Sequence, residues 1–393
     1  MFRNSTITDL FLFVFTQLIL HYLFEIFCFD YYIIIFIIIE FKLMGETMKL
    51  YIVGNGFDLS HGLKTSYKDF RLYLLEHKDE IYADGDLTIS KEEILYKFEE
   101  YCQPNELWSD FEQQTENIIS EISEKKISIF GEEWDCRLDL RRDLSKFIDK
   151  VKEELVKLGS STDIYGKHDL IKDFALNHFN DVVKKEYIWI PYLYVSFQEW
   201  IQTITVEHTK KIYEIEVNSA VVSFNYTNTM EEVYQQNEVL HLHGFVRELE
   251  DLVLGFHSKE LDEKIPGLET SFTKEHKEMG KASAEHGFKS PNSNKFHDEN
   301  IRRFYKPVNL LKDLIESFVK NKNIHEVIAL GHSYNKIDWV YFKEIIRCIP
   351  EAKYLFSYFS QNDRENIKNM IFNNKFDVNY DEIHVDNFKI KEY

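Results

Sequence analysis

The 393-residue sequence has few cysteines, and none of them is spaced as a metal or redox pair. Its four cysteines are scattered, and no C-x-x-C pair occurs. A structural zinc module of the paired-cysteine kind is therefore excluded, and the thiol content is typical of a reducing compartment. We predict a cytoplasmic protein without structural zinc.

Basic residues are also fewer than acidic residues. Lys and Arg number 47 against 67 Asp and Glu, which gives a formal net charge of -20. Nucleic acid is not an expected partner, because backbone binding needs clustered Lys and Arg that release counterions. In contrast, 44% of the residues are hydrophobic and 15% are aromatic, which is enough for a large core.

The first 47 residues differ in composition from the rest, but they contain no clean membrane span. Residues 10–23 and 31–39 are almost wholly apolar, whereas a spanning helix needs about 20 such residues. No signal-peptide cleavage site follows. We expect translation to start at Met48, which would make residues 1–47 a start-site artefact. The alternative is a membrane-associating segment, which would place the protein at a membrane.

Residues 49–70, KLYIVGNGFDLSHGLKTSYKDF, contain the most informative stretch. A short apolar run ends abruptly at a Gly-Asn-Gly turn, as a buried parallel strand does. Thr65 or Ser66 is typical of a helix N-cap, so the free N–H groups of the next helix would face the same turn. This layout predicts a phosphate or nucleotide site. Its candidate binding residues are Gly54, Asn55, Gly56, Phe57, Asp58, Thr65 and Ser66.

The stretch is neither of the common nucleotide motifs. Leu59 stands where the third glycine of G-x-G-x-x-G would fall, and no Gly-Lys-Ser/Thr follows as in a P-loop. A purely structural turn remains the alternative reading.

The rest of the chain predicts a large helical insertion at about residues 71–215 and then a return to α/β structure. Strands are expected at 220–224, 239–242 and 252–254, followed by Asn225, by His243-Gly244 and by Gly255 with His257. Ligands bind outside the carboxyl ends of parallel strands, so these residues should converge with the Gly-Asn-Gly turn. Later elements are expected as helices at Val308–Val319, Trp339–Cys348 and 364–372 and strands at 327–330, 354–359 and 383–390. The polar run at about 258–300 is expected to be a long loop.

The block at residues 54–70 resembles the opening of the bacteriophage abortive infection AbiH family, nearly letter for letter. Four motifs in order, GNGFD, SFNYT, LHLHG and LGHSYNKID, are also similar to sirtuin-like NAD-binding domains. The resemblance implies a sirtuin-like or Rossmann-like parallel sheet with a helical insertion, and NAD or a related nucleotide as ligand or substrate. It implies that Asn225 holds the ribose or orients a water and that His243 acts on a ribose hydroxyl as general base. It adds Gly244, Gly331, His332, Ser333 and Asp338 to the binding residues. The AbiH resemblance further implies an anti-phage protein that forms a homo-oligomer and responds to a trigger from the phage, which the sequence does not identify.

Two other functions stay open. His241 and His243 form an H-x-H pair, which with His257, His332 and Asp58 is the residue set of a metal-dependent phosphohydrolase. The same cavity would also suit a non-catalytic nucleotide sensor that acts through a partner. Asp58 is a departure from the sirtuin-like pattern, because a carboxylate beside a pyrophosphate is unfavourable unless it turns away or binds a cation.

Overall fold

A computed structural model describes residues 47–101, 144–157, 184–244, 252–255, 304 and 306–391, with short pieces between 111 and 135 and residues 177 and 181–182. Residues 1–46 and 256–303 lie outside this description, so the expectations about the N-terminal extension, His257 and the polar loop stay predictions. Among the described residues, no helix combines the length and apolar character that crossing a membrane requires.

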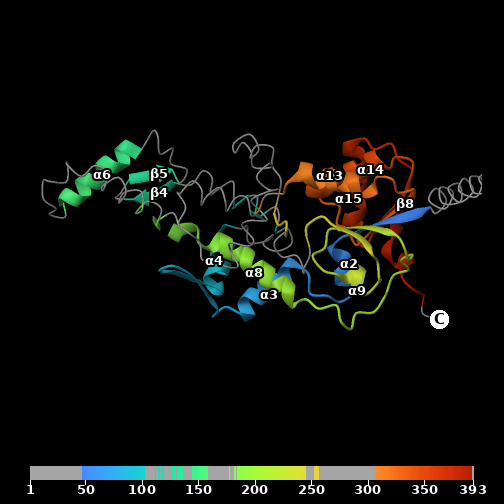
Figure 1. The fold of residues 1–393 in the computed structure, drawn as a ribbon, viewed down its shortest axis with the longest axis horizontal. Coiled ribbons are helices and arrows are strands. Elements are labelled where there is room, and N and C mark those ends of the chain that lie inside the picture. Colours follow the sequence, from blue (N-terminus) through green and yellow to red (C-terminus); the bar gives the residue numbers. More distant parts are fainter. Residues whose placement is uncertain are drawn as a thin grey trace, which may run out of the picture.

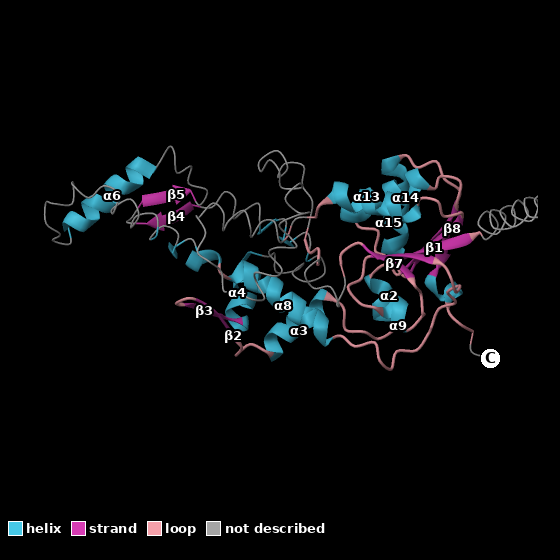
Figure 2. Ribbon diagram, viewed as in Figure 1, coloured by secondary structure: helices cyan, strands magenta, loops and turns pink. Residues whose placement is uncertain are grey.

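A six-stranded, all-parallel sheet joins β1, near the start of the described chain, to five strands that follow the helical insertion (Figure 2). Its strands are β1 (Met48–Val53), β6 (Ala220–Ser223), β7 (Glu238–His241), β8 (Ile324–Leu330), β9 (Lys353–Tyr358) and β10 (Tyr380–His384). The spatial order is β7-β6-β1-β8-β9-β10, which is the strand order of a doubly wound nucleotide-binding sheet. Strands β6 and β7 are added on one side of β1, and β8, β9 and β10 are added on its other side. The strand order therefore reverses between β1 and β8, and a ligand site is expected at the carboxyl ends of these two strands. The predicted α/β fold with a parallel sheet is confirmed.

The central strands are apolar throughout because both faces of the sheet are covered. Leu50 and Ile52 of β1 pack on one face, and Tyr51 and Val53 pack on the other, all at most 1% exposed. One face is covered by α13 (Val308–Val319), α14 (Trp339–Cys348) and α15 (Gln361–Asn374) (Figure 1). The other face is covered by α9 (Thr229–Glu232), by Phe57 of α2 (Asn55–Ser60) and by Tyr213.

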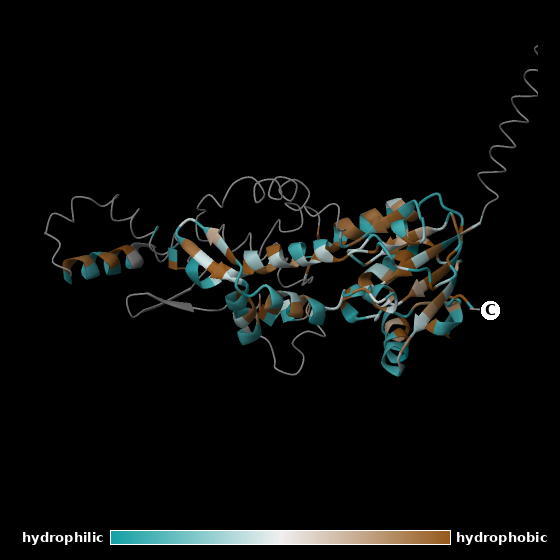
Figure 3. Ribbon diagram, turned by 90° about the horizontal axis from the view of Figure 1, so that it is seen from below, coloured by the Kyte–Doolittle hydropathy of each residue, from teal (hydrophilic) through white to brown (hydrophobic). Residues whose placement is uncertain are grey.

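The insertion between β1 and β6 is largely helical, as predicted. Its described core joins α3 (Tyr67–Glu76), α4 (Lys91–Tyr101) and α8 (Trp189–Thr203). A further helix, α6 (Leu144–Lys157), carries apolar and polar residues on different sides (Figure 3). The insertion also contains two antiparallel hairpins that were not predicted, β2–β3 (Ile81–Asp84, Leu87–Ser90) and β4–β5 (Lys126–Ile129, Glu132–Asp135).

The predicted N-cap is confirmed, because Ser66 caps α3, but a short helix that was not predicted, α2, precedes it. Two other sequence expectations about elements are corrected by the structure. Residues 252–254 are buried but do not form a strand; one backbone bond, from Val253 N to His243 O at 2.8 Å, attaches them. The expected strand at 383–390 ends at His384, because Val385–Phe388 turns into a 3₁₀ helix.

Candidate functional site

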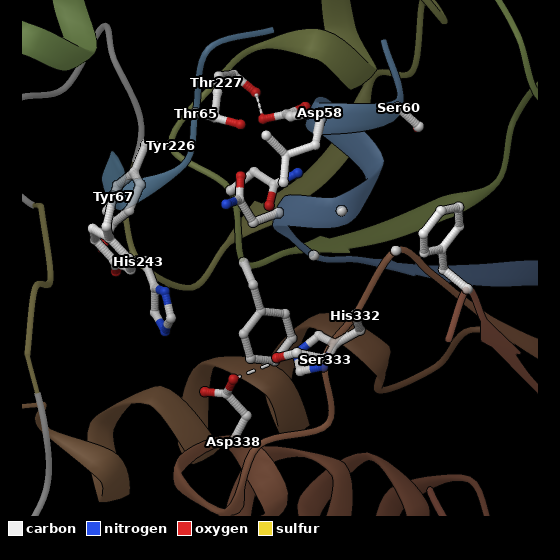
Figure 4. Close-up of a pocket in the computed structure, with 18 of the residues that line it drawn as sticks. Asp58, Ser60, Thr65, Tyr67, Tyr226, Thr227, His243, His332, Ser333 and Asp338 are labelled. Atoms are coloured by element: carbon white, nitrogen blue, oxygen red, sulfur yellow. Dashed lines mark hydrogen bonds and ion pairs between the residues drawn. The ribbon is translucent and has the colours of Figure 1, made fainter. Parts of the chain in front are cut away.

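A cavity of about 550 Å³ opens at the carboxyl ends of β1, β6, β8 and β9 (Figure 4). The sheet supplies its floor, and α3 and α8 of the helical insertion supply a wall. Most of the residues singled out in the sequence line it: Gly54, Asn55, Gly56, Asp58, Thr65, Asn225, His243, Gly331, His332, Ser333 and Asp338. The expected convergence of strand ends is therefore present.

The glycines of the floor interlock the turn after β1 with the turn after β8. Gly56 N donates to Gly331 O at 2.8 Å, and Gly54 N donates to Leu330 O at 3.1 Å. A Cβ on Gly56 would lie 2.7 Å from Gly331 O, and a Cβ on Gly331 would lie 2.1 Å from Phe57 N. Gly331 also has a φ of +63°, a conformation that favours glycine. These glycines are thus required by backbone packing, whatever the ligand is.

The same contacts occupy backbone N–H groups that were expected to bind a phosphate. Helix α2 has six residues, and its amide groups at Gly56 and Phe57 already donate to Gly331 O and Gly54 O. A helix start offers a phosphate its unpaired N–H groups, and here two of them are paired. The Gly-Asn-Gly turn therefore acts first as a packing element between two strand ends.

Asp58 is turned into a buried hydrogen-bond cluster. Its side chain accepts from Thr227 Oγ1 at 2.6 Å and from Thr229 Oγ1 at 2.9 Å, and the residue is 1% exposed. Burial raises the pKa of Asp58 to about 6, although hydrogen bonds from Thr227, Thr229 and Asn225 lower it in part. These hydrogen bonds explain how this carboxylate is tolerated: it ties α2 to the loop after β6.

Asn225 and His243 present unpaired polar atoms in the cavity. Asn225 Oδ1 and His243 Nε2 are buried without a hydrogen-bond partner among the described residues, and Thr65 Oγ1 is in the same situation. Burial lowers the pKa of His243 well below its ordinary value, and Lys306 and His332 lower it further. His243 is therefore a neutral imidazole at physiological pH, with a ring nitrogen available to a ligand or a water.

His332 and Asp338 form a second polar group at the end of β8. Tyr334 N donates to His332 Nδ1 at 2.8 Å, which puts the imidazole proton on Nε2, 3.5 Å from Asp338 Oδ2. Burial, together with Lys306, lowers the pKa of His332 to about 3. Lys306, itself fully buried, lies 3.8 Å from Asp338 Oδ1. The carboxylate of Asp338 is thus held from two sides at the edge of the cavity.

Three of the predicted binding residues do not line the cavity. Phe57 is fully buried and stacks on Tyr213 at 5.3 Å, Ser66 caps α3, and Gly244 occupies a turn with a φ of +76°. His241 and His243 also point to different places, because β7 ends at His241 and the pleat does not continue. His241 Nε2 contacts Glu231 Oε1 at 2.6 Å, and its Nδ1 lies 3.2 Å from Asn225 O.

The sequence alone gave no signal for the aromatic wall of the cavity. This wall comprises Tyr67, Phe111, Phe197, Trp200 and Tyr226. Phe111 is fully buried and also lines the cavity. Asn335, Ser357 and Asp363 are further polar lining residues that were not predicted. These residues come from a loop, from strand β9 and from the first turn of α15, and only the tertiary fold determines how these elements lie relative to one another.

The charges around the cavity are mostly negative. Asp58, Asp338 and Asp363 line it, and Lys389 is the basic residue among its described lining; that lysine pairs with Asp386 Oδ1 at 2.7 Å. The cavity therefore suits neutral or cationic parts of a ligand better than an unscreened phosphate chain.

The family model of the bacteriophage abortive infection AbiH proteins matches residues 50–359, a span that includes the Gly-Asn-Gly turn, Asn225, His243 and the β8 turn. The chain belongs to the AbiH family. It is therefore an abortive infection, anti-phage protein, and that part of the sequence resemblance is confirmed. Neither a curated protein nor a solved structure matches the chain. The sirtuin resemblance of this AbiH protein stays a prediction.

Proposed function

We propose that this AbiH protein binds NAD or a related nucleotide in the cavity and hydrolyses the bond between the ribose and the base. The observation that carries the proposal is a pair of buried polar atoms, His243 Nε2 and Asn225 Oδ1, that have no hydrogen-bond partner in the part of the chain that the structure describes; both lie at the carboxyl edge of a doubly wound sheet. Buried polar atoms without partners cost free energy, so their presence in a cavity favours a polar ligand that satisfies them.

The proposed reaction is balanced by a single water. The water oxygen attacks C1′ of the ribose while the C1′–N bond breaks and its electron pair leaves with the base. His243 Nε2 accepts the proton of the water, a role open to it because the imidazole is neutral. Asn225 Oδ1 accepts a hydrogen bond from the water or from a ribose hydroxyl.

The charge of the cavity supports bond cleavage at the ribose. Such reactions pass through a transition state with positive charge on the sugar ring, which nearby carboxylates stabilise. Phosphoryl transfer would instead need cations around the phosphate. We assign this task to Asp338, a lining carboxylate that contacts His332 and Lys306.

The metal-dependent alternative is less well supported by the described residues. Among them, the group spaced for a metal is Glu316, Glu344 and Cys348 on α13 and α14, none of which lines the cavity. His241 and Asp58, two ligands of that hypothesis, are held by Glu231 and by Thr227 and Thr229. The sensor alternative uses the same cavity without catalysis.

The test is turnover of NAD and of a nucleotide panel by the full-length protein, with and without a chelator. His243→Ala should lower turnover by roughly 10²–10⁴-fold while ligand binding stays within a few-fold. His208→Ala, at an exposed histidine, is the matched control and should change neither. Chelator should leave the reaction unchanged.

Two results would change the assignment. Loss of activity with chelator and recovery with a transition metal would favour the phosphohydrolase. Binding of nucleotide without cleavage, also after addition of an extract from phage-infected cells, would favour the sensor.

A further inference from the structure

The aromatic wall of the cavity is a built surface, not a chance grouping of core residues. Phe111 and Phe197 are fully buried and form its inner layer, while Tyr67 and Tyr226 are partly exposed and form its outer layer. Tyr67 stacks on Phe111, with ring centroids 4.6 Å apart and ring planes at 15°. Tyr226 meets Phe197 edge-to-face at 5.2 Å and 78°.

Polar contacts also hold the Tyr226 ring and the backbone that carries Tyr67. Tyr226 Oη donates to Val253 O at 2.9 Å, which fixes the ring on the buried segment 252–254. Tyr67 is the first residue of α3, directly after the N-cap Ser66, whose capping box fixes the start of the helix. In that box, Ser66 N donates to Asp69 Oδ2 at 3.0 Å and Asp69 N donates to Ser66 Oγ at 3.2 Å. The rings are therefore oriented before any ligand binds, which lowers the entropic cost of binding.

The wall lies next to the proposed reacting centre. The rings of Tyr226 and His243 have centroids 6.0 Å apart, and the two tyrosines and His243 lie on the same side of the cavity (Figure 4). Thr65, whose Oγ1 is buried without a described partner, lines the same cavity two residues before Tyr67. A flat ring attached to a ribose at His243 would meet the wall.

We propose that the aromatic wall is the subsite for the planar heteroaromatic ring of the ligand, with Tyr67 and Tyr226 as its stacking residues. The identification of that ring as part of a nucleotide rests on the proposed function. Aromatic side chains bind any base through its π face, and the neighbouring carboxylates add preference for a ring of positive charge. The helical insertion, which supplies Tyr67, Phe111, Phe197 and Trp200, thereby contributes directly to ligand specificity.

The experiment compares ligands that differ only by the ring. Nicotinamide mononucleotide and AMP each carry a ring on a ribose 5-phosphate, and ribose 5-phosphate itself lacks it. Binding to the full-length protein is measured by calorimetry for the wild type and for Tyr67→Ala and Tyr226→Ala. Both variants should weaken the two ring ligands by roughly 10- to 100-fold and leave ribose 5-phosphate within about two-fold.

Conservative variants and a control separate stacking from folding. Tyr67→Phe and Tyr226→Phe keep the ring and should bind the ring ligands nearly as the wild type does. Tyr82→Ala removes a tyrosine that stacks on Tyr192 at 4.7 Å in the same helical part but away from the cavity, and it should not distinguish the ligands. Equal weakening of all three ligands by the Tyr67 and Tyr226 variants, or no binding of ring ligands by the wild type, would overturn the proposal.

The result of this binding experiment can be distinguished from the result of the NAD turnover test. If NAD is cleaved but the alanine variants bind ring ligands normally, the subsite is wrong and the proposed function stands. If NAD is not cleaved but ring binding is lost in these variants, the subsite stands and the hydrolase proposal fails.

Discussion

The buried carboxylate of Asp58 makes the stability of the protein depend on pH in an unusual direction. Its pKa in the folded state is about 6, raised by burial from the ordinary value of 3.8. A group with a raised folded-state pKa contributes stability that is complete below its unfolded-state pKa and is lost as the pH rises through the folded-state pKa. Folding is therefore favoured by protonation of Asp58 and weakened by its ionisation.

The size of the effect follows from the shift. A difference of about two pKa units corresponds to about 3 kcal/mol, lost mostly between about pH 4 and pH 7. Asp58 is 1% exposed, so solvent screening does not reduce this figure much. Asp58→Asn keeps the shape and can still bond to Thr227 and Thr229, but it does not titrate.

The assay is urea unfolding of the wild type and of Asp58→Asn at a series of pH values. The stability of Asp58→Asn relative to wild type should rise by about 3 kcal/mol from about pH 4 to pH 8. Asp79→Asn, at an exposed aspartate, controls for the loss of one carboxylate and should show a far smaller trend. A constant difference between wild type and Asp58→Asn across this range would refute the reasoning.

Two further predictions concern the cavity floor and the start of α3. Gly331→Ala should destabilise the fold by about 2–5 kcal/mol, because it combines a positive φ with a steric clash at Phe57 N. Gly62 has a similar φ of +78°, but no atom lies within 4 Å of a Cβ added there, so Gly62→Ala should lower the free energy of unfolding by only about 1 kcal/mol. Similar losses of stability for both variants in thermal melts would show that the contact between the two turns is unimportant. Ser66→Ala should lower stability by about 1 kcal/mol, as should Ser360→Ala, which breaks the same kind of capping box at α15. A melt of Ser66→Ala indistinguishable from wild type would contradict the capping argument.

Much of the sheet could be predicted because its strands are apolar on both faces. The run at Leu50 to Val53 and the strand at β8 are legible as buried parallel strands, and the helices Val308–Val319 and Trp339–Cys348 were predicted with the observed bounds. The β2–β3 hairpin was missed although Asp84-Gly85 is a turn signal, with Gly85 at a φ of +63°. Residues 252–254 have the composition of a strand, but they form no ladder with any of the described strands, which composition cannot reveal.

Most residues that line the cavity at the strand ends could be predicted from the sequence, but what several of them do in the structure could not. Strand-end residues such as Asn225 and His243 were placed at the cavity by topology alone. The reason for the glycines was missed, since their contact partner, the turn at Gly331, is distant in the sequence. His241 was grouped with His243 by spacing, but the strand ends between them, so spacing no longer fixes their direction.

At the floor of the cavity, the turns after β1 and β8 are packed directly against each other, with no room for a side chain between them. Neither Gly56 nor Gly331 can carry a side chain, since a Cβ on either would collide with the backbone of the other turn. Changes in ligand size must be absorbed by the opposite side, where side chains of the helical insertion meet the cavity. Sequence change in this family is therefore expected to be uneven, with the two distant turns fixed as a matched pair and the wall free to diversify.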